Sequence, residues 1–225
     1  MEAILSKIRI QVSEGLYLKD PESSELGVNI IKNGIELINE LGFEDFTFRK
    51  LGQKIGSNEA SVYRYFESKN KLLMYLSSWY WAWMEYRLVL ALTNIQSPEK
   101  RLEKAVMLIA EDLKKNESSG NFNVYLLSRI VNFESSKSFL CKSVDKENKD
   151  GAFQAYKQFV ARVSNIVKEI APKYKFPNML VSSVIEGVHL QKFFAFHLPG
   201  LTNKQKNQDY IYKFFMDMVI KTIKH

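Results

Sequence analysis

The stretch TFRKLGQKIGSNEASVYRYFESKNKLL, residues 47–73, is the most informative part of the chain. It predicts two short helices, over Phe48–Ile55 and Glu59–Tyr65, followed by the start of a long third helix. Gly56 stands between them, where a helix end needs a residue that accepts a positive φ. Two helices joined by a glycine corner, with the second short and polar outside, are typical of a helix-turn-helix that reads the major groove of DNA.

Each of these two helices has an apolar side to bury. Leu51 and Ile55 lie four residues apart on the first helix, and positions four apart share a helix face. Val62 and Phe66 have the same spacing on the second helix, which Ser57 or Asn58 would cap. From residue 46 to residue 71, six Lys and Arg stand against two Glu, so phosphates would be attracted to this surface. Two amphipathic helices with a merely solvated charged face are the alternative.

The order of residues in this stretch resembles the TetR family of bacterial transcriptional regulators. The helix expected over Leu26–Leu41 also fits that family. One departure is Gly52, where the family commonly has alanine, and it should weaken its helix by up to about 1 kcal/mol. The residues that carry the resemblance are Thr47, Arg49-Lys50-Leu51, Gly56, Ser57, the run Ser61–Phe66, Lys69 and Leu72-Leu73.

The resemblance implies which residues contact DNA. Some would face the floor of the groove, and others would hold the phosphate backbone and set the register. For the tyrosines, core packing with the hydroxyl at the surface stays open. The groove-facing candidates are Asn58, Glu59, Ala60 and Ser61. The other DNA-binding candidates are Thr47, Arg49, Lys50, Tyr63, Arg64, Tyr65 and Lys69.

Composition agrees with a globular DNA-binding protein. The chain has 225 residues, is 46% hydrophobic and carries a formal charge of +7, so it can bury a core of one large or two small domains. Between Glu22 and Lys71, however, there are seven basic and eight acidic residues, so the positive charge of residues 46–71 would be concentrated on one side of the helix-turn-helix domain. The single cysteine, Cys141, excludes an internal disulfide. No signal peptide or membrane span is visible, and we expect a cytoplasmic protein.

The chain divides into three parts on this interpretation. Residues 1–19 would form an arm, where the alternation over Lys7–Val12 predicts a short β-hairpin, with an extended arm or a frayed tail as alternatives. Residues 20–70 would form the helix-turn-helix domain, and residues 71–225 a helical effector-binding and dimerisation domain. No strand pattern follows residue 20, so the predicted fold is all-α.

Helical patterns fill the rest of the chain. Asp20-Pro21 is a good helix entry, Gly42 should stop the first long helix, and a long helix is expected from about Ser68 to Leu92. The later helices are predicted over Glu99–Lys115, Asn123–Asn132, Phe139–Asn148, Ala152–Ile170, Asn178–His197 and Lys204–Lys224, with a loop over Lys115–Asn121.

In the family that the chain resembles, the C-terminal helices form a homodimer and often enclose a small molecule. Apolar residues on the last two helices could pair with a second copy, although part of them must form the chain's own core. The many aromatic residues could line a pocket, although such a stripe is usually core. The candidates for the dimer interface are Val184, Val188, Phe214, Phe215 and Met218. The candidates for the ligand site are Trp83, Tyr86, Tyr125, Arg129, Phe153, Tyr156, Glu186, His189 and Phe193.

The sequence thus favours a homodimeric repressor that binds a palindromic operator on double-stranded DNA and is released by a small-molecule effector. The alternative is an effector-independent DNA-binding regulator whose C-terminal domain only dimerises. An enzyme is disfavoured because no nucleophile elbow, phosphate-binding glycine loop or acid–base pair is visible. No cofactor or metal is expected, since His189 and His197 lie about 12 Å apart along a helix.

Overall fold

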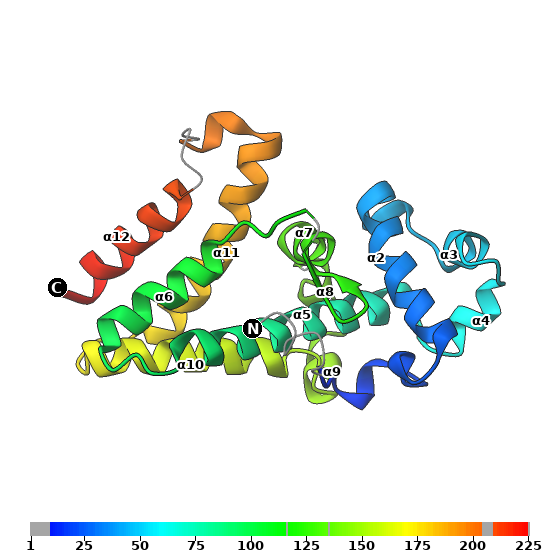
Figure 1. Cartoon of the computed structure of the whole chain (residues 1–225), viewed down its shortest axis with the longest axis horizontal. Coiled ribbons are helices and arrows are strands. Elements are labelled where there is room, and N and C mark those ends of the chain that lie inside the picture. Colours follow the sequence, from blue (N-terminus) through cyan, green and yellow to red (C-terminus); the bar gives the residue numbers. More distant parts are fainter. Residues whose placement is uncertain (1–9, 116, 135, 204–208, 225) are drawn as a thin grey trace. The chain divides into compact units, whose positions relative to one another are not determined.

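The computed structural model of the chain describes residues 10–115, 117–134, 136–203 and 209–224. Helices make up nearly all of its regular structure (Figure 1), which confirms the predicted all-α fold. Contacts divide the chain into two compact units. The first unit runs to Ala82 and includes Leu113–Ala155, and the second holds Trp83–Asp112 and the chain from Tyr156 on. This division differs from the predicted boundary at residue 70.

The first unit contains the predicted helix-turn-helix. Its reading helices begin within one residue of their predicted starts. Its elements are the 3₁₀ turns η1 (Glu14–Leu16) and η2 (Pro21–Ser23), the helices α2 (Glu25–Asp45), α3 (Phe48–Lys54), α4 (Glu59–Tyr63) and the first part of α5 (Lys69–Leu92), the strands β1 (Ser118–Ser119) and β2 (Phe122–Asn123), and the helices α7 (Val124–Glu134), α8 (Ser136–Phe139) and α9 (Val144–Lys149).

Helix α2 supports the two reading helices. It begins where the Ser24 hydroxyl accepts a hydrogen bond from the Gly27 N–H at 3.2 Å. Ile31 and Ile38 lie on its inner face and are buried, as expected for positions seven apart. Gly42 has a φ of +78° and interrupts the helical backbone near its end, where the sequence predicts a stop.

The N-terminal segment does not form the predicted hairpin in its described part. The predicted strand over Lys7–Val12 lies half outside the described residues, and residues 10–19 hold the turn η1 and no strand. Leu16 is completely buried, and the Leu18 N–H donates to the Tyr65 carbonyl oxygen at 2.8 Å. Contact with the helix-turn-helix thus replaces pairing with a second strand.

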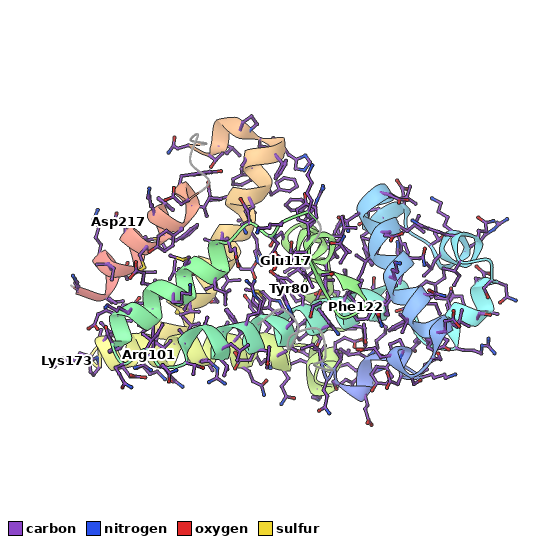
Figure 2. The ribbon with its side chains drawn as sticks, in the orientation of Figure 1. Tyr80, Arg101, Glu117, Phe122, Lys173 and Asp217 are labelled. Carbon is purple, nitrogen blue, oxygen red and sulfur yellow. The ribbon has the colours of Figure 1, made fainter. Side chains whose placement is uncertain are left out.

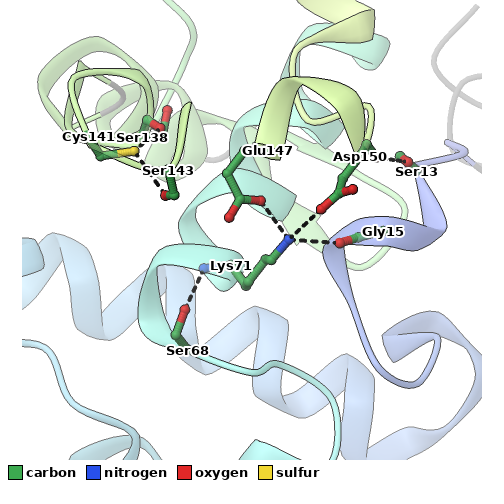
Figure 3. Close-up of polar contacts among 9 residues, drawn as sticks. All are labelled: Ser13, Gly15, Ser68, Lys71, Ser138, Cys141, Ser143, Glu147 and Asp150. Atoms are coloured by element: carbon green, nitrogen blue, oxygen red, sulfur yellow. Dashed lines mark hydrogen bonds and ion pairs between the residues drawn. The ribbon is translucent and has the colours of Figure 1, made fainter. Parts of the chain in front are cut away.

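A buried lysine fastens this segment within the first unit (Figure 3). The Lys71 ammonium group donates to the Gly15 carbonyl oxygen at 3.0 Å and to the Glu147 carboxylate at 2.6 Å. A carboxylate oxygen of Asp150 lies 3.6 Å from the same ammonium group, and the Ser13 hydroxyl donates to the Asp150 carbonyl oxygen. The N-terminal segment, α5 and α9 therefore meet at one paired, buried charge.

The segment that contains α7 and α8 is bonded directly to α2. Asn39 donates from its side chain to the Leu126 carbonyl oxygen at 3.0 Å. Glu134 accepts from the Phe43 N–H at 3.3 Å, and Lys137 forms ion pairs with both Glu134 and Glu44. These bonds explain why Leu113–Ala155 belongs with the helix-turn-helix and not with the segments that flank it.

Some predicted elements differ in detail. The helix expected over Phe139–Asn148 is broken into α8 and α9 by turns at residues 140–143. The loop predicted over Lys115–Asn121 takes part in the antiparallel β1–β2 pair, so the expected absence of strands past residue 20 was wrong. Four residues give too short a pattern for period-two alternation to show.

The second unit is a set of packed helices. Helix α10 buries Phe159, Val163 and Val167, and α12 buries residues spaced four apart, which gives each helix one apolar face. The elements of this unit are the last part of α5, α6 (Pro98–Ala110), most of α10 (Gln154–Ile170), α11 (Pro177–His197), the turn η3 (Pro199–Leu201) and α12 (Tyr210–Lys224). The predicted start of the last helix, at Lys204, lies outside the described residues.

The packing of α11 on α12 corrects three of the five predicted dimer-interface residues. Val184, Val188 and Phe215 are buried within this single chain. A methyl group on Gly187 would lie 2.6 Å from the Phe215 ring, so the two helices approach closely at that glycine. The intramolecular core claims these side chains because it needs one apolar face from each helix. Phe214, by contrast, is 59% exposed.

Candidate nucleic-acid interface

The corner between α3 and α4 has the geometry that the sequence predicts. Gly56 has a φ of +66°, a backbone conformation that glycine adopts without steric cost. Asn58 caps α4, with its side-chain oxygen accepting from the Ser61 N–H at 2.9 Å. Val62 and Phe66 are completely buried, which confirms the inner face predicted for the second helix, while on the first helix Leu51 is completely buried and Ile55 half-buried. The corner therefore packs its apolar side into the core and leaves the opposite side of α4 outside.

A close backbone approach explains the glycine at position 52. A methyl group there would lie 2.9 Å from the Asn58 carbonyl carbon and 3.0 Å from the Glu59 nitrogen. Helix α3 thus touches the first residues of α4 backbone to backbone. The departure from the family's common alanine has a local structural reason, beyond the expected loss of helix propensity.

The outer face of the two helices is open to solvent. On α3, the Thr47 hydroxyl accepts from the Lys50 N–H at 3.2 Å, which confirms its capping role. Arg49 is exposed, and the Lys50 ammonium group donates to the Asp45 carbonyl oxygen at 2.8 Å. The predicted groove-facing residues at the start of α4, Asn58, Glu59 and Ala60, are all exposed.

Ser61 corrects the predicted reading face. Its side chain is buried, with the whole residue only 9% exposed, and its hydroxyl donates to the Asn58 side-chain oxygen at 3.0 Å. The Arg64 guanidinium group donates to the same hydroxyl at 3.3 Å. Ser61 therefore positions the side chains of Asn58 and Arg64 by hydrogen bonds, and its own buried hydroxyl group is not exposed for a contact with a DNA base.

The two tyrosines differ from each other. Tyr63 is 49% exposed and packs edge-on against Phe48, with ring centroids 5.0 Å apart, so it stays a candidate for a phosphate contact. Tyr65 is 3% exposed, and its hydroxyl is hydrogen-bonded to Ser24 at 2.8 Å. This hydrogen bond lowers the pKa of Tyr65 against the opposing effect of burial, with a smaller effect from Lys19. The predicted phosphate contact of Tyr65 is thus wrong, because its hydroxyl joins α2 to the corner.

Lys69 is also occupied within the chain. Its ammonium group donates to the carbonyl oxygens of Phe43 and Glu44 at 3.0 Å each, and to that of Phe46 at 3.4 Å. It lies 4.8 Å from the centre of the Phe43 ring. Lys69 therefore satisfies carbonyl groups at the end of α2, a structural role that the prediction of a phosphate contact missed.

The local excess of positive charge is smaller than the sequence suggests. Lys54 forms ion pairs with Glu36 and Glu40, and Lys71 is buried against Glu147. Lys71 is therefore not available to a phosphate, and the two carboxylates offset the charge of Lys54. The exposed cations that remain on this surface are Arg49, Lys50 and Arg64.

One further cation, Lys19, lies beside this surface and was not predicted from the sequence. The Lys19 ammonium group lies 5.2 Å from the centre of the Tyr65 ring. The contact joins residues 46 positions apart, so no local pattern could have signalled it. The only sequence hint is the position of Lys19 immediately before the helix entry at Asp20.

The predicted ligand-site residues do not all lie in one unit. Tyr125, Arg129 and Phe153 belong to the first unit with the helix-turn-helix, which separates them from the rest of the set. In the second unit, the Tyr156 hydroxyl donates to Glu186 at 2.9 Å, and burial, followed by this carboxylate, raises the pKa of the hydroxyl. The other predicted residues of the second unit are Trp83, Tyr86, His189 and Phe193.

The second unit has a groove of about 830 Å³ between α5, α6 and α10. Arg162 pairs with Glu85 across it, and Arg101, labelled in Figure 2, pairs with Glu169. Val89 is 40% exposed in its wall. The groove combines an apolar wall with charged groups, as small-molecule sites do, but none of the nine predicted ligand residues lines it.

Other site classes find no support in the described part of the chain. No cluster of three or more His, Cys, Asp or Glu side chains in that part is arranged to hold a metal ion. Among the same residues, no helix combines the length and hydropathy that crossing a bilayer requires.

The fold and the α3–α4 corner together define a helix-turn-helix protein whose second unit is all-helical. Residues 30–76 match the family model described as bacterial regulatory proteins, tetR family. This match confirms the resemblance in the sequence: the chain carries the TetR-family helix-turn-helix. No curated protein is similar enough to the chain to count as a match.

Solved structures share the fold. AibR, solved in complex with isovaleryl coenzyme A and operator DNA, has a TM-score of 0.59 at 14% identity, over 84% of this chain and 95% of that one. PfmR, a TetR-family transcriptional regulator from Thermus thermophilus, has a TM-score of 0.58 at 15% identity, over 87% and 99%. A transcriptional regulator from Saccharomonospora viridis, in complex with choline, has a TM-score of 0.57 at 17% identity, over 87% and 95%.

Proposed function

We propose that the chain is a DNA-binding transcriptional repressor, which binds a palindromic operator as a homodimer and is released by a small-molecule effector. The exposed first turn of α4 carries the proposal. Asn58, Glu59 and Ala60 are open to solvent there, while Val62 behind them is completely buried. A short helix held in this way presents side chains to base edges in the major groove. That AibR was solved with operator DNA supports the proposal by likeness of fold.

The exposed residues suit different parts of a DNA site. The Glu59 carboxylate accepts from a cytosine amino group, and the Ala60 methyl group contacts a thymine methyl group. Thr47, Arg49 and Lys50 lie at the start of α3, where they would hold phosphate and set the register. Specificity would therefore come from α4 and most of the affinity from α3 and the flanking cations.

Selection of bound duplexes from random DNA tests this proposal. We expect an enriched palindrome, and we expect Glu59→Gln to change the preferred base at one position of each half-site. Lys168→Gln, on the exposed surface of α10, is the control and should leave the selected sequence unchanged. Failure to enrich any sequence, with no salt-dependent binding to any duplex, would contradict the proposal.

The homodimer is proposed from apolar side chains left exposed on the last helices. Leu190, Phe196 and Phe214 are 52%, 72% and 59% exposed, and Met218 lies on the same helix as Phe214. A symmetric dimer would place two reading helices about 34–36 Å apart, or a multiple of that, to match two half-sites. Phe214→Glu should give monomers in sedimentation, whereas Leu140→Glu, which charges an exposed apolar residue in the first unit, should not.

The effector is proposed to bind in the second unit. The groove between α5, α6 and α10 has a suitable volume and lining, and two proteins of similar fold were solved with small molecules bound. A thermal-shift screen should find a compound that stabilises the chain and weakens operator binding. Ala161→Trp, in the groove wall, should abolish that response and retain basal DNA binding. If no compound class stabilises the chain, the effector-independent regulator becomes the better description.

A further inference from the structure

We propose that Lys19, outside the helix-turn-helix, binds a phosphodiester group of the DNA backbone beside the C-terminal end of α4. This inference rests on the proposed DNA-binding function and adds a contact to it. Lys19 follows a segment that is fixed on the helix-turn-helix, and its ammonium group lies at the Tyr65 ring.

The N-terminal segment holds Lys19 at a fixed place on the helix-turn-helix. Leu16 is completely buried, and the Leu18 N–H donates to the Tyr65 carbonyl oxygen immediately after α4. Tyr17 packs edge-on against Tyr75 of α5, with ring centroids 6.1 Å apart. A lysine that follows three anchored residues loses less backbone entropy on binding than one on a free tail.

Two cations act on one hydroxyl group at this position. The Lys19 ammonium group lies 5.2 Å from the centre of the Tyr65 ring, and Arg64 follows the last residue of α4. Both lower the pKa of the Tyr65 hydroxyl, after the larger effects of the Ser24 hydrogen bond and burial. The exposed Lys19 ammonium group attracts a phosphate group at this place, and Arg64 adds positive charge to the same region.

The carboxylates nearest Lys19 in sequence are bonded elsewhere. Asp20 accepts from the Glu22 N–H at 2.9 Å, and Glu22 accepts from the Tyr75 hydroxyl at 3.1 Å. Among the residues that the structure describes, neither Lys19 nor Arg64 forms an ion pair. Beside a helix that enters the major groove, the anion that DNA would bring to Lys19 is backbone phosphate.

The test is the salt dependence of operator binding by the full chain. We expect Lys19→Gln to weaken binding roughly fivefold to tenfold at low salt and to reduce the slope of log K against log salt by about 0.9. The loss should be similar on operator and unrelated duplexes, since a phosphate contact carries no sequence information. Lys19→Arg should restore most of the slope, and Lys168→Gln is the control for an equal change of net charge.

The possible failures are distinguishable. If the native chain binds DNA with a steep salt slope and Lys19→Gln retains that slope, the Lys19 contact is wrong while the proposed function stands. A change in the preferred base, with the slope unchanged, would also overturn the phosphate assignment. If the native chain binds no duplex at any salt concentration, both proposals fail together. Thermal melting of each variant shows whether a loss of binding reflects a loss of folding.

Discussion

A methyl group on Gly52 would lie 2.9 Å from the carbonyl carbon of Asn58, closer than side-chain carbons ordinarily come to backbone atoms. The first reading helix and the cap of the second are thus in backbone contact. Asn58 is the residue from which the exposed turn of α4 begins. The orientation of the reading surface depends on this contact, since any displacement at Gly52 moves the cap.

Gly52→Ala should therefore destabilise the chain, although alanine is the better helix former. We expect the gain of up to about 1 kcal/mol in helix propensity to be outweighed by an overpacking cost of about 1–3 kcal/mol. Gly34→Ala in α2 is the matched control, since its methyl group would meet Leu72 at an ordinary 3.4 Å and should stabilise. Urea unfolding measures both. If Gly52→Ala stabilised the chain as much as Gly34→Ala, the backbone around Gly52 and Asn58 would be able to move apart without cost, and the prediction would be wrong.

Lys69→Ala should lower the free energy of unfolding by about 1–3 kcal/mol, because three carbonyl oxygens near the end of α2 lose their charged donor. Lys50→Ala removes a donor from one exposed carbonyl oxygen and should cost less, about 0.5 kcal/mol. Urea unfolding distinguishes the two. A Lys69→Ala variant of native stability, with a lower salt slope for DNA binding, would return Lys69 to the phosphate role first predicted.

Lys71→Met should destabilise the first unit by about 3–5 kcal/mol, since it leaves the Glu147 carboxylate buried without its cation. The double variant Lys71→Met with Glu147→Leu should recover much of that loss, because no unpaired charge remains. Chemical unfolding of the native chain, the single variant and the double variant measures both changes in the free energy of unfolding. A double variant less stable than Lys71→Met alone would show that the Glu147 side chain stabilises the unit even without its cation, and would contradict this account.

His189 should make stability depend on pH. Burial, followed by Lys192, lowers its pKa from 6.5 to about 3, so the unfolded chain takes up the proton first as pH falls. The stabilisation is complete above pH 6.5 and is lost progressively as pH falls towards 3, by at most about 1.4 kcal/mol per pH unit. Urea unfolding between pH 5 and 6.5 should show this slope, since most carboxylates titrate below that range.

Matched variants assign the pH slope to its residue. His189→Gln should flatten the slope between pH 5 and 6.5, and His197→Gln, which alters an exposed histidine on the same helix, should leave it. A slope that persists in His189→Gln would show that another group titrates there.

Local sequence predicted the corner itself. The glycine φ, the Asn58 cap and the buried Val62 depend on residues within a few positions of one another, and each follows from the preferences of one or two side chains. The starts of α3 and α4 were predicted for the same reason. The exposure of Glu59 and Ala60 follows from their place opposite the apolar face.

Contacts between distant parts of the chain escaped prediction. The Tyr65 hydroxyl is bonded to Ser24, 41 positions away, and Lys69 to carbonyl groups 23 to 26 positions away. Both side chains have the chemistry of a phosphate contact, and no local pattern shows that the chain itself already uses their polar atoms. The same limit applies to the docking of Leu16 and to the buried pairing of Lys71.

Apolar patterns also could not separate core from interface. Val184 and Val188 have the spacing of an apolar helix face whether that face meets α12 or a second copy of the chain. Phe214 and Phe215 are adjacent and chemically identical, yet one is 59% exposed and the other 4%. Only their positions on the folded helix distinguish them.

The amino-acid sequence by itself determined that the chain is helical and that residues 47–66 form a helix-turn-helix, because capping, glycine φ and helical periodicity act between near neighbours. Tertiary structure decided which polar side chains of that motif remain free. It bonded Tyr65 and Lys69 to distant parts of the chain and buried Ser61, and it left Arg49, Glu59 and Ala60 exposed, since burial and hydrogen bonding between distant segments depend on the whole fold.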